Sequence, residues 1–420
     1  MLSVSSFIVN GGKRLSGEAE VQGAKNSALP ILAATVLTKG ENVLFNCPRL
    51  SDVDASLRIL RFLGCEAKEQ GEAVIVKSDN LSDSEIPERL MREMRGSIVF
   101  LGALLARTGR ARLSFPGGCE LGPRPIDLHL KALRKMGAKI SERHGVIECK
   151  ADKGLRGAKI NLSFPSVGAT ENIILAAALA EGTTTIINAA REPEICDLCD
   201  FLNESGAKIY GSGEGVIVID GVQELSGASH DIIPDRIEAA TLMAAAAITA
   251  GEITLRGVIR NHLSSIIPLF EEMGCETGFK NGDMSFSAPQ KLRAVPLIRT
   301  MPYPGFPTDA QALLMAVAAV CGGTTVFAEN IFENRFKHVD GLMRLGADIH
   351  VQGRVAVVNG VNELYGARVE ATDLRGAASL IVAALRAEDK TEVNGIEYLE
   401  RGYDGLELVL SSLGADVRKL

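Results

Sequence analysis

One short pattern recurs six times along the chain and constrains its fold more than any other feature. Gly followed by Ala or Cys closes a helix-like segment at six positions spaced 68 to 73 residues apart: Gly64, Gly137, Gly206, Gly274, Gly346 and Gly414. Because glycine is the usual residue just past a helix C-terminus, each copy marks the end of a helix. The pattern predicts six repeated units, and the length of 420 residues favours two domains of three units each.

Each unit also contains an earlier, alanine-rich segment that is apolar on nearly every face. These segments are residues 28–37, 97–106, 170–180, 238–249, 311–320 and 377–386. A helix without a polar face belongs inside a core, whereas the helix before each repeat glycine is amphipathic. Alternating apolar runs such as residues 216–219 predict strands. We therefore expect an α/β protein whose units each run strand, buried helix, strand, surface helix and two paired strands, with the buried helices enclosed by sheets.

The midpoint of the six repeats lies near Pro234 and divides the chain. One domain is predicted over residues 25–233, and the other combines residues 1–24 with 234–420. A short leader strand at Ser6–Asn10 is expected to complete the sheet of the last unit. This pairing would bring both ends of the chain into one domain.

Composition argues against several classes of function. Trp is absent, aromatic residues make up 5% and the net charge is -7, so neither a stacking platform nor a basic surface for nucleic acid is expected. No apolar run is long enough to span a membrane and no signal peptide is apparent, so we expect a cytoplasmic protein. The eight cysteines are scattered, as in a reducing compartment, and the lone pair Cys196 and Cys199 does not make a metal site.

Charged residues precede several of the buried segments, at the predicted helix N-termini. Lys25, Arg95 and Arg375 occupy such places. Free N–H groups and the helix dipole attract anions there, so the pattern predicts an anionic ligand. Asp309 is the acidic exception at an equivalent place. It is either a helix N-cap or a base whose charge is favoured by neighbouring cations.

Arginines recur at the entrances to the surface helices. They lie 11 to 15 residues before the repeat glycines, at Arg49, Arg124, Arg191, Arg260, Arg335 and Arg401. Arginine grips carboxylate or phosphate groups with two N–H donors. We expect structural roles for Arg191 and Arg260 and ligand binding by Arg124 and Arg335. Because no Walker or Rossmann glycine pattern is present, the ligand is predicted to be small and strongly anionic rather than a conventionally bound triphosphate or dinucleotide.

Residues 116–129 contain three glycines and three prolines, a composition that argues against regular secondary structure. Cys119 and Arg124 are therefore predicted to lie on a shaped loop. A thiol beside a fixed cation is either a reactive group or a small buried cysteine in a turn.

Several separated motifs, in order from one end of the chain to the other, resemble a known family. They are residues 23–26, 94–97, 116–119, 124–129, 166–170, 306–309, 332–336 and 401–403. This set is similar to the UDP-N-acetylglucosamine 1-carboxyvinyltransferases, the enolpyruvyl transferases that open peptidoglycan synthesis. The resemblance implies a two-domain inside-out α/β barrel with three units per domain, closing around its substrates. It also implies that no metal or organic cofactor is used.

The resemblance further implies a reaction and a role for each matching residue. The 3-hydroxyl of UDP-N-acetylglucosamine adds to C2 of phosphoenolpyruvate, and phosphate is then expelled. Cys119 is expected to protonate C3 and to confer sensitivity to fosfomycin, and Asp309 to accept the hydroxyl proton. Lys25, Arg124 and Arg401 are expected to hold the phosphate, with Arg335 and Arg375 on the carboxylate. Substrate contacts are also expected from Asn26, Arg95, Arg124, Pro125, Ile126, Asp127, Leu128, Ser166, Val167 and Ile331.

Two alternatives to this function stay open at the level of the sequence. The sister enolpyruvyl transferase that acts on shikimate 3-phosphate shares the fold, although it is not expected to use a cysteine at the position of Cys119. A non-catalytic relative that binds a nucleotide sugar is the second alternative. Phe164 departs from the family pattern, because some relatives have a lysine there. His129 and Glu192 are further polar positions similar to those of the family.

Overall fold

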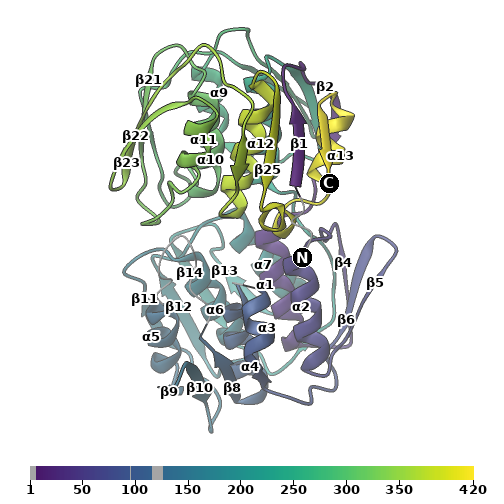
Figure 1. Ribbon diagram of the computed structural model, residues 1–420. Coiled ribbons are helices and arrows are strands. Elements are labelled where there is room, and N and C mark those ends of the chain that lie inside the picture. Colours follow the sequence, from purple (N-terminus) through teal and green to yellow (C-terminus); the bar gives the residue numbers. More distant parts are fainter. Residues whose placement is uncertain (1–5, 95, 116–125) are drawn as a thin grey trace. The chain divides into compact units, whose positions relative to one another are not determined.

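The computed structural model describes residues 6–94, 96–115 and 126–420 (Figure 1). The described residues form two compact units. Unit 1 contains residues 6–22 and 234–420, and unit 2 contains residues 23–94, 96–115 and 126–233. The chain passes between them after Gln22 and after Ile233. The first crossing lies two residues before the expected boundary, because the amide of Ala24 donates to Ile233 O at 2.7 Å and so belongs with unit 2.

The predicted order of elements is confirmed in five of the six repeats, although the second contains an additional short helix; the sixth has a single strand after its surface helix. The first repeat contains β2 (Ser16–Glu20), α1 (Lys25–Ala34), β4 (Glu41–Phe45), α2 (Ser51–Phe62), β5 (Glu66–Gln70) and β6 (Ala73–Lys77). The second contains β7 (Glu85–Ile86), α3 (Glu88–Glu93), α4 (Phe100–Thr108), β8 (Arg110–Ser114), α5 (Asp127–Lys135), β9 (Lys139–Arg143) and β10 (Val146–Lys150). The third contains β11 (Lys159–Asn161), α6 (Val167–Ala177), β12 (Thr183–Ile187), α7 (Pro193–Glu204), β13 (Lys208–Tyr210) and β14 (Val216–Asp220).

The fourth repeat contains β16 (Ser229–Asp231), α8 (Arg236–Ile248), β17 (Glu252–Arg256), α9 (Ile267–Glu272), β18 (Glu276–Lys280) and β19 (Asp283–Ser287). The fifth contains β20 (Leu297–Arg299), α10 (Thr308–Ala318), β21 (Thr324–Ala328), α11 (Val339–Arg344), β22 (Asp348–Gln352) and β23 (Val355–Asn359). The sixth contains β24 (Arg368–Glu370), α12 (Leu374–Arg386), β25 (Lys390–Asn394), α13 (Leu406–Ser412) and β26 (Asp416–Lys419). Short 3-10 helices and one minor strand pair complete the described chain: η1 (Thr35–Leu37), η2 (Ser97–Val99), η3 (Arg260–Leu263), η4 (Ile396–Arg401), β3 (Thr38–Lys39) and β15 (Leu225–Ser226).

The described strands include six four-stranded sheets, in each of which a parallel edge strand joins an antiparallel ladder, as in the order β20-β21-β23-β22. The leader strand β1 (Ser6–Asn10) lies between β25 and β26 and is antiparallel to both, so the prediction that it completes the last sheet is confirmed. At each crossing the chain changes unit between an edge strand and the next buried helix. Strand β2 pairs with β17 of unit 1, whereas α1 belongs to unit 2; strand β16 pairs with β4 of unit 2, whereas α8 belongs to unit 1.

The repeat glycines take the helix-ending conformation that the sequence predicts. Their φ angles lie between 96° and 103°, in the left-handed region that side chains disfavour. The alanine-rich helices form the cores: α1, α4 and α6 in unit 2, and α8, α10 and α12 in unit 1. Figure 1 shows α10 and α12 lying side by side in unit 1. Within the described residues, none of the helices combines the length and the hydropathy that a membrane crossing needs.

The bounds of the buried helices differ from the predicted ones in a consistent way. Five of them begin two or three residues earlier than the apolar run, because polar residues lie at the N-cap or in the first turn of each helix. Ser166, for example, accepts a hydrogen bond from the amide of Ala169 and starts α6 at Val167. The remaining segment, predicted as one helix over 97–106, is divided into η2 and α4. The predicted loop at 116–129 is also too long, because α5 begins at Asp127, just after the last proline.

Candidate active site

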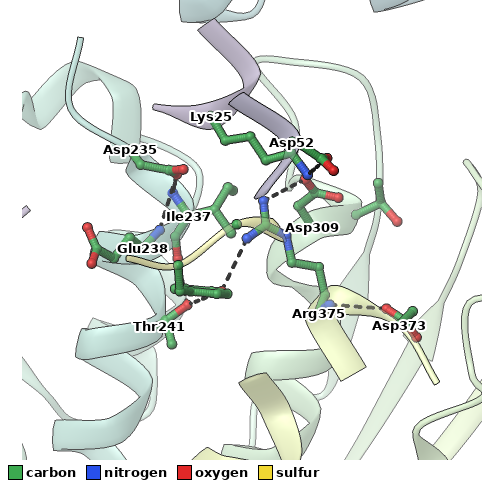
Figure 2. Close-up of polar contacts among 12 residues, drawn as sticks. Lys25, Asp52, Asp235, Ile237, Glu238, Thr241, Asp309, Asp373 and Arg375 are labelled. Atoms are coloured by element: carbon green, nitrogen blue, oxygen red, sulfur yellow. Dashed lines mark hydrogen bonds and ion pairs between the residues drawn. The ribbon is translucent and has the colours of Figure 1, made fainter. Parts of the chain in front are cut away.

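Unit 1 contains a buried cluster of one aspartate and two arginines. Asp309 is the second residue of α10; its Oδ1 accepts a hydrogen bond from Arg335 Nη2 at 3.0 Å and its Oδ2 accepts one from Arg375 Nη2 at 3.1 Å. Figure 2 shows the contact between Asp309 and Arg375. The arginine side chains are 3% and 4% exposed, whereas that of Asp309 is 28% exposed. Asp309, Arg335 and Arg375, which we call the aspartate–arginine cluster, therefore combine a partly accessible carboxylate with two buried cations.

Neighbouring groups fix the orientation of both guanidinium groups. Arg335 donates from Nε and Nη2 to Thr308 O at 3.3 and 3.0 Å. Arg375 is the second residue of α12, and its Nη1 donates to the hydroxyl of Tyr403 at 3.2 Å. Helix α12 begins at this point because Asp373 Oδ1 accepts hydrogen bonds from the amides of Arg375 and Gly376, both at 3.1 Å. The cluster is thus held in place before any ligand binds.

The cluster determines the protonation state of Asp309. Burial alone would raise the pKa of its carboxyl group, but the charges of Arg375 and Arg335 outweigh burial and hold this pKa below its usual range. Asp309 is therefore ionised at neutral pH and is a weak base in this arrangement. The alternative that Asp309 is a helix N-cap is wrong, because Pro307 occupies that position and Asp309 lies in the first turn.

A buried glutamate that the sequence did not reveal supports the same region. Glu329 is 1% exposed, and its Oε1 accepts hydrogen bonds from the amides of Ile331 at 2.8 Å and Phe332 at 3.0 Å. Its Oε2 accepts one from the hydroxyl of Thr308 at 3.0 Å. Glu329 therefore joins the predicted substrate contact Ile331 to the start of α10. The sequence signal that could have identified Glu329 is its position as a charged residue directly after strand β21.

Unit 2 places the predicted phosphate ligand Lys25 in a buried ion pair. Lys25 is the first residue of α1, and its Nζ lies 2.6 Å from Asp52 Oδ2 (Figure 2). Asp52 is the second residue of α2 and is 2% exposed. Asp52 is not among the residues predicted from the sequence. Its carboxylate balances the charge of Lys25 in an environment where an isolated ammonium group would be costly.

Other predicted contacts in unit 2 lie at helix starts. Asp127 is exposed in the first turn of α5; its hydrogen bond to Lys131 Nζ at 3.0 Å is the main reason that the pKa of its carboxyl group is lowered. Ile126 is buried just before this helix, and Leu128 is half-buried within it. The remaining predicted substrate contacts described in unit 2 are half-buried residues at the starts of α1 and α6: Asn26, Ser166 and Val167.

The other predicted arginines and the loop residues around Cys119 differ in what the structure says about them. Arg401 ends η4 of unit 1 and is half-buried. Arg191 Nε donates to Gly213 O at 3.1 Å, and the guanidinium of Arg260 lies 5.1 Å from the centre of the Phe279 ring, in agreement with their expected structural roles. Four predicted site residues lie outside the described residues, so their roles stay predictions: Arg95, Cys119, Arg124 and Pro125.

His129, one of the further polar positions similar to those of the family, is buried and joins two helices of unit 2. Its Nδ1 accepts a hydrogen bond from Asn172 Nδ2 at 3.0 Å, which links α5 to α6. Burial lowers the pKa of His129 to about 4, so the imidazole is neutral. Glu192 precedes α7 and accepts a hydrogen bond from the amide of Arg191 at 3.0 Å. Among the residues that the structure describes, no group of three or more His, Cys, Asp or Glu is arranged to hold a metal ion.

Comparison with known proteins places this geometry in a family. Residues 9–410 match the family model described as EPSP synthase (3-phosphoshikimate 1-carboxyvinyltransferase). The chain belongs to the enolpyruvyl transferase family. A solved member, the enolpyruvyl transferase NikO from Streptomyces tendae, superposes with a TM-score of 0.89 at 28% identity, over 99% of this chain and 98% of that one. An EPSP synthase from Acinetobacter baumannii gives a TM-score of 0.77 at 20% identity over 99% of both chains, which concerns the fold alone.

Three relatives of higher identity share the name UDP-N-acetylglucosamine 1-carboxyvinyltransferase. The chain is 51% identical to UDP-N-acetylglucosamine 1-carboxyvinyltransferase 2 of Caldanaerobacter subterraneus subsp. tengcongensis, over 99% of this chain and 100% of the relative. It is 50% identical to UDP-N-acetylglucosamine 1-carboxyvinyltransferase 1 of Symbiobacterium thermophilum, over 99% and 95%, and 47% identical to the enzyme of Geobacter metallireducens, over 99% and 100%. The predicted fold class, an inside-out α/β barrel of the enolpyruvyl transferase type, is confirmed.

Proposed function

We propose that this protein transfers the enolpyruvyl group of phosphoenolpyruvate to the 3-hydroxyl of UDP-N-acetylglucosamine and releases phosphate. The observation that carries the proposal is the identity of 47 to 51% with full-length relatives of that name, compared with 20% to a solved EPSP synthase. In this role the enzyme catalyses the first committed step of peptidoglycan synthesis. Its substrates are two small anionic molecules, and neither a nucleic acid nor a membrane takes part.

The aspartate–arginine cluster supplies a place for the carboxylate of phosphoenolpyruvate. Arg335 and Arg375 are planar donors whose orientation is already fixed, and both now bind Asp309. A substrate carboxylate that engages the two guanidinium groups competes with Asp309 for their N–H donors. The pKa of Asp309 then rises, because the cations that hold it down are shared with the ligand. Substrate binding thus turns a weak base into a better one.

The proton balance assigns one step to each catalytic group. Cys119 gives a proton to C3 of phosphoenolpyruvate, which leaves C2 electrophilic, and the 3-hydroxyl of the sugar attacks C2 while Asp309 accepts its proton. In the second stage C3 returns a proton to the Cys119 thiolate, the double bond re-forms and the C2–O bond to phosphate breaks, and the departing phosphate takes the proton that Asp309 had accepted. Cys119 is also proposed as the residue that fosfomycin modifies. The substrate carboxylate stays charged throughout, and Arg335 and Arg375 are proposed to hold it while C2 becomes tetrahedral.

Lys25 is proposed to bind the phosphate together with Arg124 and Arg401. Its ammonium group is held 2.6 Å from Asp52 Oδ2, so a phosphate must share this cation with the carboxylate. Asp52 holds the lysine in place, and the more highly charged phosphate adds its own contact to the ammonium group. The substrate contacts expected from the first turns of α1, α5 and α6 belong to the same proposal.

Organisation and location complete the proposal. The two units are proposed to be the two enolpyruvyl transferase domains, over residues 25–233 and over residues 1–24 with 234–420. A cytoplasmic location is supported by the state of the cysteines, because the seven described ones are all free thiols. The expectation that no cofactor is needed rests on the balanced chemistry above, in which every proton has a donor and an acceptor on the chain or the substrates.

The test is a phosphate-release assay with phosphoenolpyruvate and each of two acceptors. We expect release with UDP-N-acetylglucosamine and none above background with shikimate 3-phosphate. Turnover with shikimate 3-phosphate alone would overturn the assignment in favour of the sister enzyme. Binding of UDP-N-acetylglucosamine without any phosphate release would support the non-catalytic alternative instead.

A further inference from the structure

A buried row of polar side chains crosses unit 2 from α1 to the last strand before the crossing at Ile233. The hydroxyl of Ser27 donates to Asp197 Oδ2, and Asp197 Oδ1 lies 3.0 Å from His230 Nε2. On the other side of the ring, His230 Nδ1 lies 2.7 Å from Glu204 Oε2. Ser27, Asp197 and His230 are all buried, whereas Glu204 reaches solvent. We call Ser27, Asp197, His230 and Glu204 the Asp197 network.

The network joins the two points at which the chain enters and leaves unit 2. Ser27 lies in the first turn of α1, two residues after Lys25. Asp197 Oδ2 also accepts a hydrogen bond from the amide of Ile233 at 3.3 Å, and Ile233 O accepts one from the amide of Ala24 at 2.7 Å. One carboxylate therefore holds both the start of α1 and the last residue of the unit.

Charge makes this arrangement specific. The charged groups that face His230 are Asp197, Asp200 and Glu204, all on α7, and the edge of the Phe201 ring lies against the imidazole. Burial disfavours the charged ring, but the bonds to Asp197 and Glu204 prevail and raise the pKa of His230 to about 9. The imidazolium can then donate one N–H to each carboxylate. Asp197 Oδ2 is left to bind Ser27 and Ile233.

Such a network contributes more to geometry than to stability. Burying charges costs free energy that their mutual attraction only partly restores, so a buried ion pair is weak support for a stabilising role. In the Asp197 network, however, both ring nitrogens of His230 and both oxygens of Asp197 have partners. A fully bonded network of this kind allows one arrangement of the groups that it joins.

We propose that Asp197 and His230 are positioning residues that fix the first turn of α1, and with it Lys25 and Asn26. The inference rests on the proposed function only in taking Lys25 as a ligand of the substrate phosphate. Neither Asp197 nor His230 touches the substrate in this account. They act through Ser27 and the backbone of Ile233, which set where α1 begins.

The experiment compares Ser27→Ala and His230→Gln with a matched control, Ser205→Ala. Ser205 is also a buried serine of unit 2, but its hydroxyl donates to Phe201 O, outside the network. We expect both network variants to raise KM for phosphoenolpyruvate about tenfold, with kcat within about threefold of wild type, because ground-state phosphate binding is what weakens. A loss of stability alone would reduce the active fraction without changing KM. The control is expected to keep the wild-type KM.

Hydrogen exchange gives a second readout that does not depend on turnover. In both network variants we expect amide exchange of the α1 peptide to become at least about tenfold faster, while the control leaves it unchanged. Unchanged KM and unchanged α1 exchange in both variants would overturn the positioning role. If wild-type protein released no phosphate, the proposed function would fail, and faster α1 exchange in the variants would still support positioning while unchanged exchange would still refute it.

Discussion

The Lys25–Asp52 pair of unit 2 and the aspartate–arginine cluster of unit 1 lie at similar places in the repeat but differ in charge balance. In unit 2 one buried ammonium group faces one carboxylate, and the formal charges sum to zero. In unit 1 one carboxylate faces two guanidinium groups, which leaves a formal surplus of one positive charge. The difference indicates that unit 1 attracts an incoming carboxylate more strongly, whereas the lysine of unit 2 must be shared between Asp52 and the ligand.

The largest effect is expected from Asp309→Asn, which removes the carboxylate from the cluster. We expect kcat to fall by about two to four orders of magnitude, because the sugar hydroxyl loses its proton acceptor. KM for phosphoenolpyruvate should stay the same or decrease, since the two arginines lose an anionic competitor. Steady-state phosphate release measures both values. Asp340→Asn, at an exposed aspartate in the same unit, is the control, and a wild-type kcat in Asp309→Asn would contradict the assigned role.

The next largest effect tests the neutral pair of unit 2. Asp52→Asn removes the carboxylate partner of a buried lysine, and we expect a loss of about 3 to 5 kcal/mol in the free energy of unfolding. Added phosphate should stabilise this variant more than wild type, because an anion can replace the missing charge. Asp54→Asn, in the same helical turn but exposed, should change little. Thermal unfolding with and without phosphate measures these differences, and equal stability of Asp52→Asn and wild type would show that the pair is unimportant.

A smaller effect is expected when the positive charge at position 335 is kept but the planar guanidinium group is replaced. Arg335→Lys retains the positive charge, but an ammonium group cannot make the planar two-pronged contact. We expect KM for phosphoenolpyruvate to rise about tenfold, which corresponds to about 1.4 kcal/mol. Arg260→Lys is the control within unit 1, because Arg260 packs over Phe279 away from the cluster. Steady-state kinetics that match wild type in Arg335→Lys would mean that charge alone matters there.

The smallest effect concerns pH. The pKa of His230 is raised from 6.5 to about 9 by its carboxylate partners, so its stabilising contribution is complete below about pH 6.5 and is lost as pH rises through about 9. We expect His230→Gln to be less stable than wild type at pH 7 by on the order of 1 kcal/mol, and this difference to shrink above pH 9. Unfolding measured between pH 6 and pH 10 tests this, and a constant difference across the range would contradict it.

Much of the fold could be predicted because its signals are local. The six glycines lie directly after the helices that they end, and the alanine-rich runs need no distant partner to identify them as buried. Partners such as Asp52, Glu329 and Asp197 could not be predicted, because contacts between residues distant in the sequence define them; Ser27 and Asp197, for example, are 170 positions apart. The helix starts were missed by two or three residues for a related reason. Polar residues at a helix start resemble loop residues in the sequence, and in α6, α8 and α12 the side-chain capping bond that marks the start is seen only in the structure.

The pairing of charges within the site likewise could not be predicted from the sequence. The sequence predicts Lys25, Asp309, Arg335 and Arg375 as site residues from family motifs and from their positions at helix starts. Their motifs did not reveal that Asp309 bridges the two arginines or that Lys25 is already paired. These pairings change the chemistry. Asp309 is a weak base until substrate binds, and Lys25 must be shared between Asp52 and the substrate phosphate.

The central claim is that the chain transfers an enolpyruvyl group to UDP-N-acetylglucosamine. The most direct measurement is mass spectrometry of the nucleotide sugar after incubation of the wild-type protein with phosphoenolpyruvate. The account predicts a product heavier than UDP-N-acetylglucosamine by one enolpyruvyl group, formed in equal amount to the released phosphate. Recovery of unchanged nucleotide sugar, with the enolpyruvyl group found instead on shikimate 3-phosphate when that acceptor is supplied, would contradict it.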